Sequence, residues 1–142
     1  MMRGTFTPKL DDKSRLTLPA KYRVLLSDEV SVVCEPDRCL GIYAKAVLDE
    51  EMEPINSAPS TIQAVRDYKR WTQSRAEDAT PDKQGRVTIT PMQRAWANLD
   101  KEVVVIGASD HLEVWDPNKW AERLARLDDK FADFDGEIVP RS

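Results

Sequence analysis

Two short stretches of the chain each place an aspartate four residues before an arginine. The first contains Asp11 and Arg15, and the second contains Asp82 and Arg86. An arginine whose planar guanidinium is held in one direction can donate two parallel hydrogen bonds to O6 and N7 of a guanine in the major groove of DNA. The aspartate can hold it by accepting hydrogen bonds across a turn. This D-x-x-x-R spacing therefore predicts a site that reads guanine on double-stranded DNA.

Each stretch also contains a lysine, Lys13 in the first and Lys83 in the second. Lysine ammonium groups contact phosphates and set the register of a protein on DNA without reading its sequence. The candidate DNA-binding residues are therefore Asp11, Lys13, Arg15, Asp82, Lys83 and Arg86. The alternative is an Asp–Arg pair that only closes a surface turn, an interaction that contributes ~0–1 kcal/mol.

The charge of the chain is unevenly distributed. Its 142 residues carry a formal net charge of −4, which by itself argues mildly against nucleic acid as a partner. Residues 1–24, however, hold six basic residues against two acidic ones, and residues 82–94 hold three against one. The acidic excess lies chiefly in residues 48–53 and 128–137. Positive charge therefore gathers around the two D-x-x-x-R stretches.

The two stretches belong to a longer internal repeat. Residues 10–25 align with residues 81–96 at a constant offset of 71 positions, and beyond them the offset becomes 72. We interpret this pattern as a duplication. Because a half of about 70 residues seldom holds a core of its own, residues 1–75 and 76–142 are expected to interleave into one pseudo-symmetric barrel. Two separate units on one chain fit the pattern as well.

Both halves have the same predicted order of elements. A short strand leads to a proline that opens a short helix, at Pro19 or Pro91, and two further strands follow. Thr90 can cap the second of these helices. The predicted strands cover residues 15–18, 30–34 and 39–43 in the first half and 86–89, 103–106 and 112–115 in the second.

A longer helical segment follows the strands in each half. In the first half a helix over 44–53 is expected to stop at Pro54, and a second helix is expected over 61–75, with Ser60 and Gln63 at capping-box spacing. In the second half Asp116 is an expected N-cap. The helix after it carries one apolar stripe, at Trp120, Leu124, Leu127 and Phe131. That stripe packs on its own sheet or, alternatively, contacts a neighbouring subunit.

Composition excludes several other classes of protein. No apolar run approaches the ~20 residues that span a bilayer, and the start of the chain lacks the apolar stretch of a signal peptide, so a soluble, cytoplasmic protein is expected. Two cysteines, Cys34 and Cys39, and a single histidine, His111, predict thiols and an exposed histidine rather than a metal site. No cofactor is expected. We assign no function to the final residues 139–142.

The motif sequences resemble a known family. DDKSRLTLPAKYR (residues 11–23) and DKQGRVTITPMQR (residues 82–94) closely resemble the two D-x-x-x-R motifs of the MraZ family, bacterial transcriptional regulators. The opening G-T-F-T-P-K-L-D-D-K and the later V-V-I-G and L-E-V-W are in register with the same family. The resemblance extends from about Thr5 to Phe131.

This resemblance implies a fold and a function. The fold would be α+β, an internally duplicated AbrB-like swapped-hairpin β-barrel with flanking helices. The protein would bind direct, tandem G-rich boxes upstream of the division and cell-wall gene cluster, as a repressor or an activator. It would assemble with itself into a ring, usually an octamer, and associate with the nucleoid. The family's DNA contacts correspond here to Asp11, Arg15, Asp82 and Arg86; Lys13 and Lys83 are added on electrostatic grounds.

One position departs from the family pattern, which has glycine immediately before the arginine. Gly85 keeps this glycine in the second motif, but the first motif has Ser14. Glycine allows positive φ and a close approach of backbone to DNA. Ser14 can adopt that conformation at some cost or turn outward to a phosphate, so the two halves need not contact DNA equally.

Three other functions compete with this interpretation. An enzyme would need convergent groups, but the neighbouring carboxylates Asp11-Asp12 and Asp128-Asp129 would point to opposite faces if extended, so no catalysis is expected. An AbrB-type antitoxin that binds DNA and neutralises a toxin is typically a short chain with one motif. A scaffold would use the Trp120–Phe131 stripe to bind another protein without contacting DNA.

Overall fold

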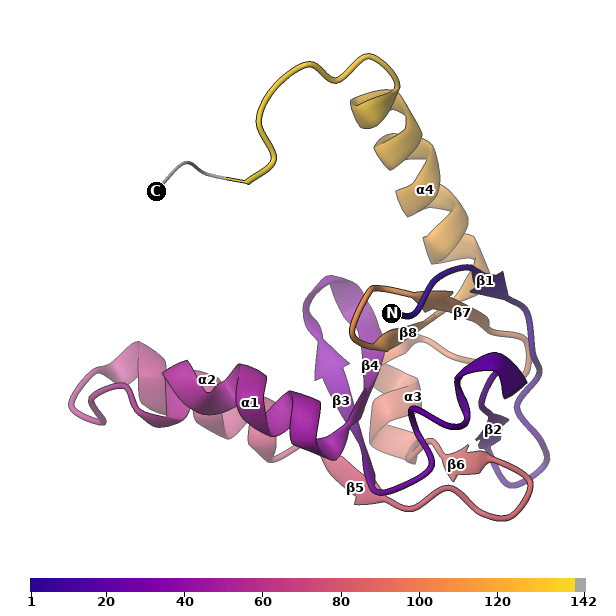
Figure 1. The fold of residues 1–142 in the computed structure, drawn as a ribbon, viewed down its shortest axis with the longest axis horizontal. Coiled ribbons are helices and arrows are strands. Elements are labelled where there is room, and N and C mark those ends of the chain that lie inside the picture. Colours follow the sequence, from indigo (N-terminus) through magenta and orange to yellow (C-terminus); the bar gives the residue numbers. More distant parts are fainter. Residues whose placement is uncertain (140–142) are drawn as a thin grey trace.

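The computed structural model describes residues 1–139 and has an α+β fold (Figure 1). The strands are β1 (Thr5–Phe6), β2 (Arg15–Thr17), β3 (Val30–Glu35), β4 (Cys39–Ala44), β5 (Glu77–Ala79), β6 (Arg86–Thr88), β7 (Val104–Gly107) and β8 (Leu112–Trp115). The helices are α1 (Lys45–Asn56), α2 (Gln63–Gln73), α3 (Pro91–Ala97) and α4 (Pro117–Ala132), with short 3₁₀ turns η1 (Ala20–Tyr22) and η2 (Pro36–Arg38). The predicted α+β class is confirmed.

Six strands form one antiparallel sheet in the order β1-β7-β8-β4-β3-β5, and β2 pairs with β6 in a separate two-stranded ribbon. The expected closed barrel is wrong in this respect, because no ladder joins the edge strands β1 and β5 within residues 1–139. These edges are only two and three residues long. Each edge strand is followed by a polar stretch that leads into the ribbon, so the chain leaves the sheet before it can close.

The strand order of the sheet is symmetric with respect to the two halves. Replacing each strand by its counterpart in the other half gives the same order, read from the opposite edge. β4 of the first half pairs with β8 of the second half at the centre, with Leu40 opposite Val114 and Ile42 opposite Leu112. Each edge strand pairs with a strand of the other half, β1 with β7 and β5 with β3. The hydrogen bonding therefore crosses between the halves at both edges and at the centre.

One buried cluster draws side chains from both halves of the chain. Within β2 and β6 the alternating residues Leu16 and Val87 point into it and are 0% and 2% exposed. Cys34 and Cys39 are buried free thiols. Other fully buried members of the cluster include Leu18, Leu26, Val30, Val32, Leu40, Ile42, Ile89, Val103, Val105, Leu112 and Val114.

α1 and α2 lie beside each other and extend away from one end of the sheet (Figure 1). The prediction that the first of them stops at Pro54 is wrong, since α1 continues to Asn56. Proline removes one backbone donor, and so near the end of a helix its cost is small; Ser57 N–H still donates to the Glu53 carbonyl at 2.9 Å. The predicted capping box at Ser60 does not form, because α2 begins at Gln63 after an uncapped Ile62.

The caps predicted in the second half are confirmed. The Thr90 side chain accepts from Gln93 N–H at the start of α3, and Asp116 accepts from Lys119 N–H at the start of α4. These bonds satisfy backbone donors that have no partner inside a helix.

α4 projects away from the sheet (Figure 1). Trp120, in its first turn, packs on Trp115 with ring centroids 5.4 Å apart. Further along the stripe, Leu124 and Phe131 are 41% and 45% exposed. Packing of the stripe on its own sheet is therefore limited to the start of the helix. Within residues 1–139, none of the helices is both long enough and apolar enough to cross a membrane.

Candidate nucleic-acid interface

The first D-x-x-x-R stretch forms a tight turn, which we call turn 1 (residues 11–15), around one carboxylate. Oδ1 of Asp11 accepts from the backbone N–H groups of Lys13 at 3.0 Å and Arg15 at 2.8 Å. Oδ2 accepts from Nε of Arg15 at 2.6 Å. The N–H of Ser14 closes the turn by donating to the Asp11 carbonyl at 2.9 Å. The aspartate therefore fixes both the backbone and the direction of the guanidinium.

The second stretch, turn 2 (residues 82–86), repeats this arrangement. Oδ1 of Asp82 accepts from the N–H groups of Gln84 and Arg86, both at 2.9 Å, and Oδ2 accepts from Nε of Arg86 at 2.8 Å. The N–H of Gly85 donates to the Asp82 carbonyl at 2.8 Å. The predicted support of each arginine by its aspartate is present in both turns.

The β2–β6 ribbon holds the two turns together. Arg15 lies opposite Thr88 and Thr17 lies opposite Arg86 in the antiparallel register. Side chains two residues apart share one face of a strand, so Arg15, Thr17, Arg86 and Thr88 share one face of the ribbon while Leu16 and Val87 are buried beneath it. Both arginines therefore project from the same side of the molecule.

The guanidinium groups are partly exposed. The side chains of Arg15 and Arg86 are 30% and 25% exposed. Nη1 of Arg86 also comes within 3.9 Å of Oδ2 of Asp11, so Asp11 interacts with both arginines. Lys13 and Lys83 lie exposed on their turns. A basic surface with two oriented arginines is the result.

Hydrogen bonding keeps the two aspartates ionised. The backbone N–H of Arg15, followed by its side chain and the N–H of Lys13, holds the pKa of Asp11 below its ordinary value against partial desolvation. The backbone N–H and the side chain of Arg86 lower the pKa of Asp82 in the same way. Both carboxylates are therefore negatively charged at neutral pH and continue to orient the arginines.

Ser14 and Gly85 have the same backbone conformation but different surroundings. Both have positive φ, 58° and 73°. A Cβ at Gly85 would lie 2.7 Å from Nε of Arg23, so the Arg23 side chain fills the space that a larger residue would need. That Nε donates to the Leu18 carbonyl at 3.2 Å. Arg94, at the matching place beside turn 1, has a buried Nε without a hydrogen-bond partner in the described chain.

The sequence interpretation missed some residues of this surface. Thr17 and Thr88 lie exposed between the arginines, and two-residue periodicity along each strand was the signal that would have identified them. Arg23 and Arg94 align in the repeat, but their placement behind the turns depends on contacts between distant segments.

His111 is not the exposed residue that was expected. Its side chain is 14% exposed, stacks on Tyr43 with ring centroids 4.3 Å apart, and lies 2.7 Å from Asp110 and 3.4 Å from Glu113. Burial lowers the pKa of His111, but the hydrogen bonds to Glu113 and Asp110 outweigh it and raise that pKa to about 9. In residues 1–139 no three His, Cys, Asp or Glu side chains are arranged to hold a metal ion.

Comparison with known proteins identifies the relatives of this chain. The family described as "MraZ protein, putative antitoxin-like" matches residues 1–71 and 73–137. The chain belongs to the MraZ family. A protein of Parafrankia sp. named "Transcriptional regulator MraZ" is 43% identical over 140 residues, which cover 99% of this chain and 98% of that protein. A protein of the same name from Cutibacterium acnes is 44% identical over 133 residues, 94% of each chain.

Membership in the MraZ family covers both turns, since each matched range contains one D-x-x-x-R stretch. A third relative of the same name, from Nocardioides sp., is 43% identical over 93% of this chain and 92% of its own length. The similarity is therefore not confined to the motifs and includes the strands and helices that position them.

Proposed function

We propose that this chain is a sequence-specific, double-stranded DNA-binding transcription regulator that reads guanine through its two turns. The observation that carries this proposal is the β2–β6 ribbon, which places Arg15 and Arg86 on one exposed face. The relatives named transcriptional regulators support it. The expected targets are tandem G-rich boxes upstream of the division and cell-wall gene cluster, and the protein would be associated with the nucleoid.

The geometry of each turn suits base reading. The Nε of each arginine is bound to its aspartate, so the two terminal nitrogens remain to donate to O6 and N7 of a guanine. Diagonal neighbours across a two-stranded ribbon lie about 7–8 Å apart, which is close to two base-pair steps of about 3.4 Å. Arg15 and Arg86 would then read guanines two steps apart, while Lys13 and Lys83 contact phosphates.

The same proposal includes an AbrB-like swapped-hairpin arrangement of the two halves. Pairing of β1 with β7, β5 with β3 and β2 with β6 supports it, because each of these ladders joins one half to the other. The two ranges matched by one family description support the duplication.

Assembly into a ring, an octamer by resemblance to the family, is part of the proposed mechanism. Apolar side chains that a single chain leaves exposed support self-association: Val24 at 85%, Leu25 at 53%, Leu124 at 41% and Phe131 at 45%. A ring would align the basic turns of several copies on one face and keep the acidic segments elsewhere. Several weak contacts on tandem boxes would then add up to tight binding.

A gel-shift titration on DNA with one G-rich box and with several boxes in tandem tests the proposal, together with a footprint on the upstream region of the chain's own gene. We expect weak binding to one box, much tighter binding to the tandem array, and regularly spaced protection. Equal affinity for one and several boxes would refute the avidity mechanism, and the absence of any protected G-rich box would refute the regulator.

A scaffold that binds protein through α4 is the second candidate, favoured by the exposed Leu124 and Phe131. It predicts intact self-assembly with no DNA binding at modest salt. An antitoxin predicts in addition a tight complex with a toxin. Measuring assembly by native mass spectrometry beside the gel shift separates these outcomes from the regulator.

A further inference from the structure

A cavity of about 150 Å³ lies between the sheet and the α1–α2 pair, away from the two turns. Leu48, Met52 and Ile55 of α1 form one apolar wall, and Tyr68 and Trp71 of α2 form an aromatic wall. Both helices are only partly buried here: α1 has no fully buried residue and α2 has only Thr72. A void of this size holds a ring of about six carbon atoms, so the cavity can hold a small organic molecule.

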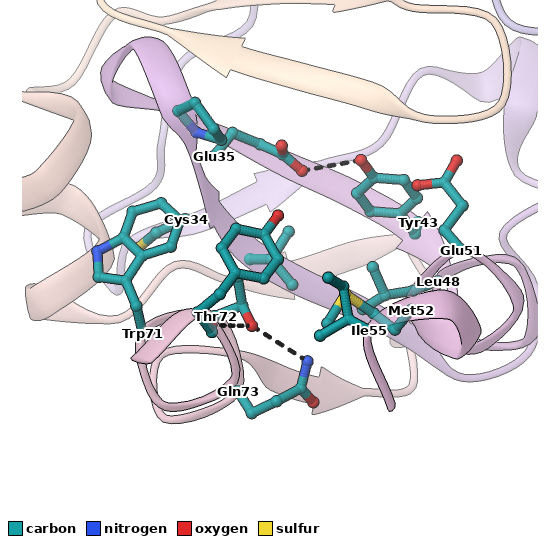
Figure 2. Close-up of a pocket in the computed structure, with 13 residues that line it drawn as sticks. Cys34, Glu35, Tyr43, Leu48, Glu51, Met52, Ile55, Trp71, Thr72 and Gln73 are labelled. Atoms are coloured by element: carbon teal, nitrogen blue, oxygen red, sulfur yellow. Dashed lines mark hydrogen bonds between the residues drawn. The ribbon is translucent and has the colours of Figure 1, made fainter. Parts of the chain in front are cut away.

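Carboxylate groups border this apolar space. Figure 2 shows Glu35 of β3 bonded to the Tyr43 hydroxyl, with Glu51 of α1 beside Tyr43 and Trp71 across the cavity. The hydroxyl donates to Oε1 of Glu35 at 2.8 Å. Glu35 lies across Gly41, where a Cβ would collide with the carboxylate, so the absence of a side chain at Gly41 leaves room for it. Glu35 is therefore held in a defined position on the wall of the cavity.

The charges around this wall are predominantly negative. His111 stacks on Tyr43, but it is already paired with Asp110 and Glu113. Neither Glu35 nor Glu51 forms an ion pair in the described chain. Burial raises the pKa of Glu35. A hydrogen bond with Asp110, with burial in second place, raises the pKa of Glu51 to about 7. The positive charge of His111 favours the ionised forms of both groups, but it is shared with Asp110 and Glu113. The wall of the cavity therefore favours a further cation.

We propose that the cavity binds a small organic cation, with an ammonium or guanidinium group at Glu35 and Glu51 and an apolar body between the walls formed by α1 and Trp71. A few polar groups in an otherwise apolar and aromatic pocket are typical of small-molecule sites. The faces of Tyr68 and Trp71 also attract a cation, and an ammonium group would donate charge-assisted hydrogen bonds to the carboxylates.

The cavity is connected to turn 2, which makes its ligand a candidate effector of DNA binding; this step rests on the proposed function. The chain runs from α2 through β5 to Asp82, which lies three residues after that strand ends. Gln93, which is completely buried, donates to the carbonyls of Val32 at 3.0 Å and Arg75 at 3.2 Å, and so joins the strand behind the cavity to the end of α2. A ligand that orders α2 would stabilise the start of that connection.

Benzylamine is a suitable probe, with benzyl alcohol and benzoate as neutral and anionic controls of the same size. Titration of the full chain at pH 8, followed by NMR and by fluorescence of the tryptophans, should show millimolar binding of benzylamine, as expected for about eight non-hydrogen atoms. Shifts should be confined to β3, β4, α1 and α2. Binding of benzyl alcohol should be about ten-fold weaker or more, because it lacks the charged hydrogen bond.

Two variants on α1 provide a matched pair. Glu51→Gln removes a carboxylate that borders the cavity, and Glu50→Gln removes its exposed neighbour, which does not line it. We expect only Glu51→Gln, and likewise Glu35→Gln, to abolish the preference for benzylamine over benzyl alcohol. Equal affinity for the two probes, equal effects of the Glu51 and Glu50 substitutions, or shifts spread over the whole surface would overturn the proposed site.

The coupling to DNA is measured separately, by gel shift at constant ionic strength with and without benzylamine. A change in DNA affinity in the unmodified chain and not in Glu51→Gln supports the effector. Unchanged DNA affinity in both would leave a binding site but refute the effector. Binding of benzylamine to a chain that binds no DNA at all would refute the proposed regulator while the cavity site stands.

Discussion

Turns 1 and 2 have nearly the same internal geometry and different support. In each, one carboxylate oxygen accepts two backbone N–H groups and the other accepts the arginine Nε. Behind turn 2, Arg23 lies against Gly85 and bonds to the Leu18 carbonyl. Behind turn 1, Ser14 replaces the glycine, and the buried Nε of Arg94 has no partner in the described chain.

This difference separates two parts of the site. The Asp–Arg hydrogen bonds depend on residues within one turn, whereas the arginine behind the turn comes from a distant segment of the chain. The Asp–Arg hydrogen bonds need only three intervening residues, one of which accepts positive φ, as Ser14 does. At turn 2 the Arg23 side chain occupies the space that a Cβ at Gly85 would fill, and its Nε is hydrogen-bonded to the Leu18 carbonyl. Turn 1 therefore keeps the Asp–Arg hydrogen bonds that orient its arginine, but the Nε of Arg94 beside it makes no hydrogen bond like that of Arg23, the buttress of turn 2.

Removing either of the two arginines proposed to read guanine should have the largest effect on DNA binding. Arg15→Ala and Arg86→Ala are each expected to cost ~1–3 kcal/mol per engaged site and to relax the preference for guanine. The loss should be greater for Arg86 if the buttress behind turn 2 improves orientation. Competition gel shifts with guanine-substituted boxes measure both quantities.

Arg126→Ala is the matched control for these variants, because Arg126 is an exposed arginine on α4, far along the chain from both turns. It should change neither affinity per box nor base preference. Full sequence discrimination in both turn variants would show that the arginines do not read the DNA.

Changes of pH should distinguish the turns from the partly buried ion pairs of His111 with Asp110 and Glu113. The folded-state pKa of His111 is raised from 6.5 to about 9, so its stabilising charge is fully present below pH 6.5 and is lost as the pH rises through 9. The free energy of unfolding should fall over this interval, by an amount on the order of 2–3 kcal/mol. Chemical denaturation at pH 6.5 and at pH 9.5 measures the fall.

The substitution His111→Gln should flatten the pH dependence of the free energy of unfolding. The orientation of the two arginines should not change with pH. The pKa values of Asp11 and Asp82 are lowered, so both aspartates remain ionised throughout this range. Guanine preference is therefore expected to be constant between pH 6.5 and 8. Stability that rises with pH in the unmodified chain would contradict the proposed role of His111.

Exchanging Ser14 and Gly85, the residues immediately before the two arginines, should reverse the difference in support between turn 1 and turn 2. Ser14→Gly relieves a left-handed conformation, which costs an L-residue about 1 kcal/mol, and frees space beside Arg94. Gly85→Ser should destabilise the fold by about 1–2 kcal/mol, since its Cβ would displace Arg23. Thermal unfolding of both variants and of the double variant measures these changes; a stabilising Gly85→Ser would refute the buttress.

Sequence signals that act over a few residues predicted much of this structure. Six of the eight strands, the caps at Thr90 and Asp116, and the Asp–Arg hydrogen bonds depend on neighbours within four positions. The short edge strands β1 and β5 were not predicted, because they form only by pairing with distant strands. Pro54 misled the prediction because its effect depends on its distance from a helix end that other residues decide.

Features that join distant segments could not be predicted in the same way. His111 is largely shielded from solvent because Tyr43, from the other half, stacks on it. Its spacing of two residues from Glu113 was a local signal for the contact between them. The open sheet depends on where the short edge strands end. The placement of Arg23 behind Gly85 joins residues more than sixty positions apart.

Substitutions of the lysines in the two turns should have the smallest effect on DNA binding, and they separate phosphate contacts from base reading. Lys13 follows an additional acidic residue, Asp12, whereas Lys83 directly follows Asp82, so turn 2 carries more net positive charge than turn 1. Each lysine should contribute to phosphate binding, and Lys83→Ala should reduce the slope of log affinity against log salt by about 0.9. Lys13→Ala should reduce it by less, because Asp12 already offsets part of its charge. Neither substitution should alter guanine preference, and a change in base preference would show that the lysines read bases rather than phosphates.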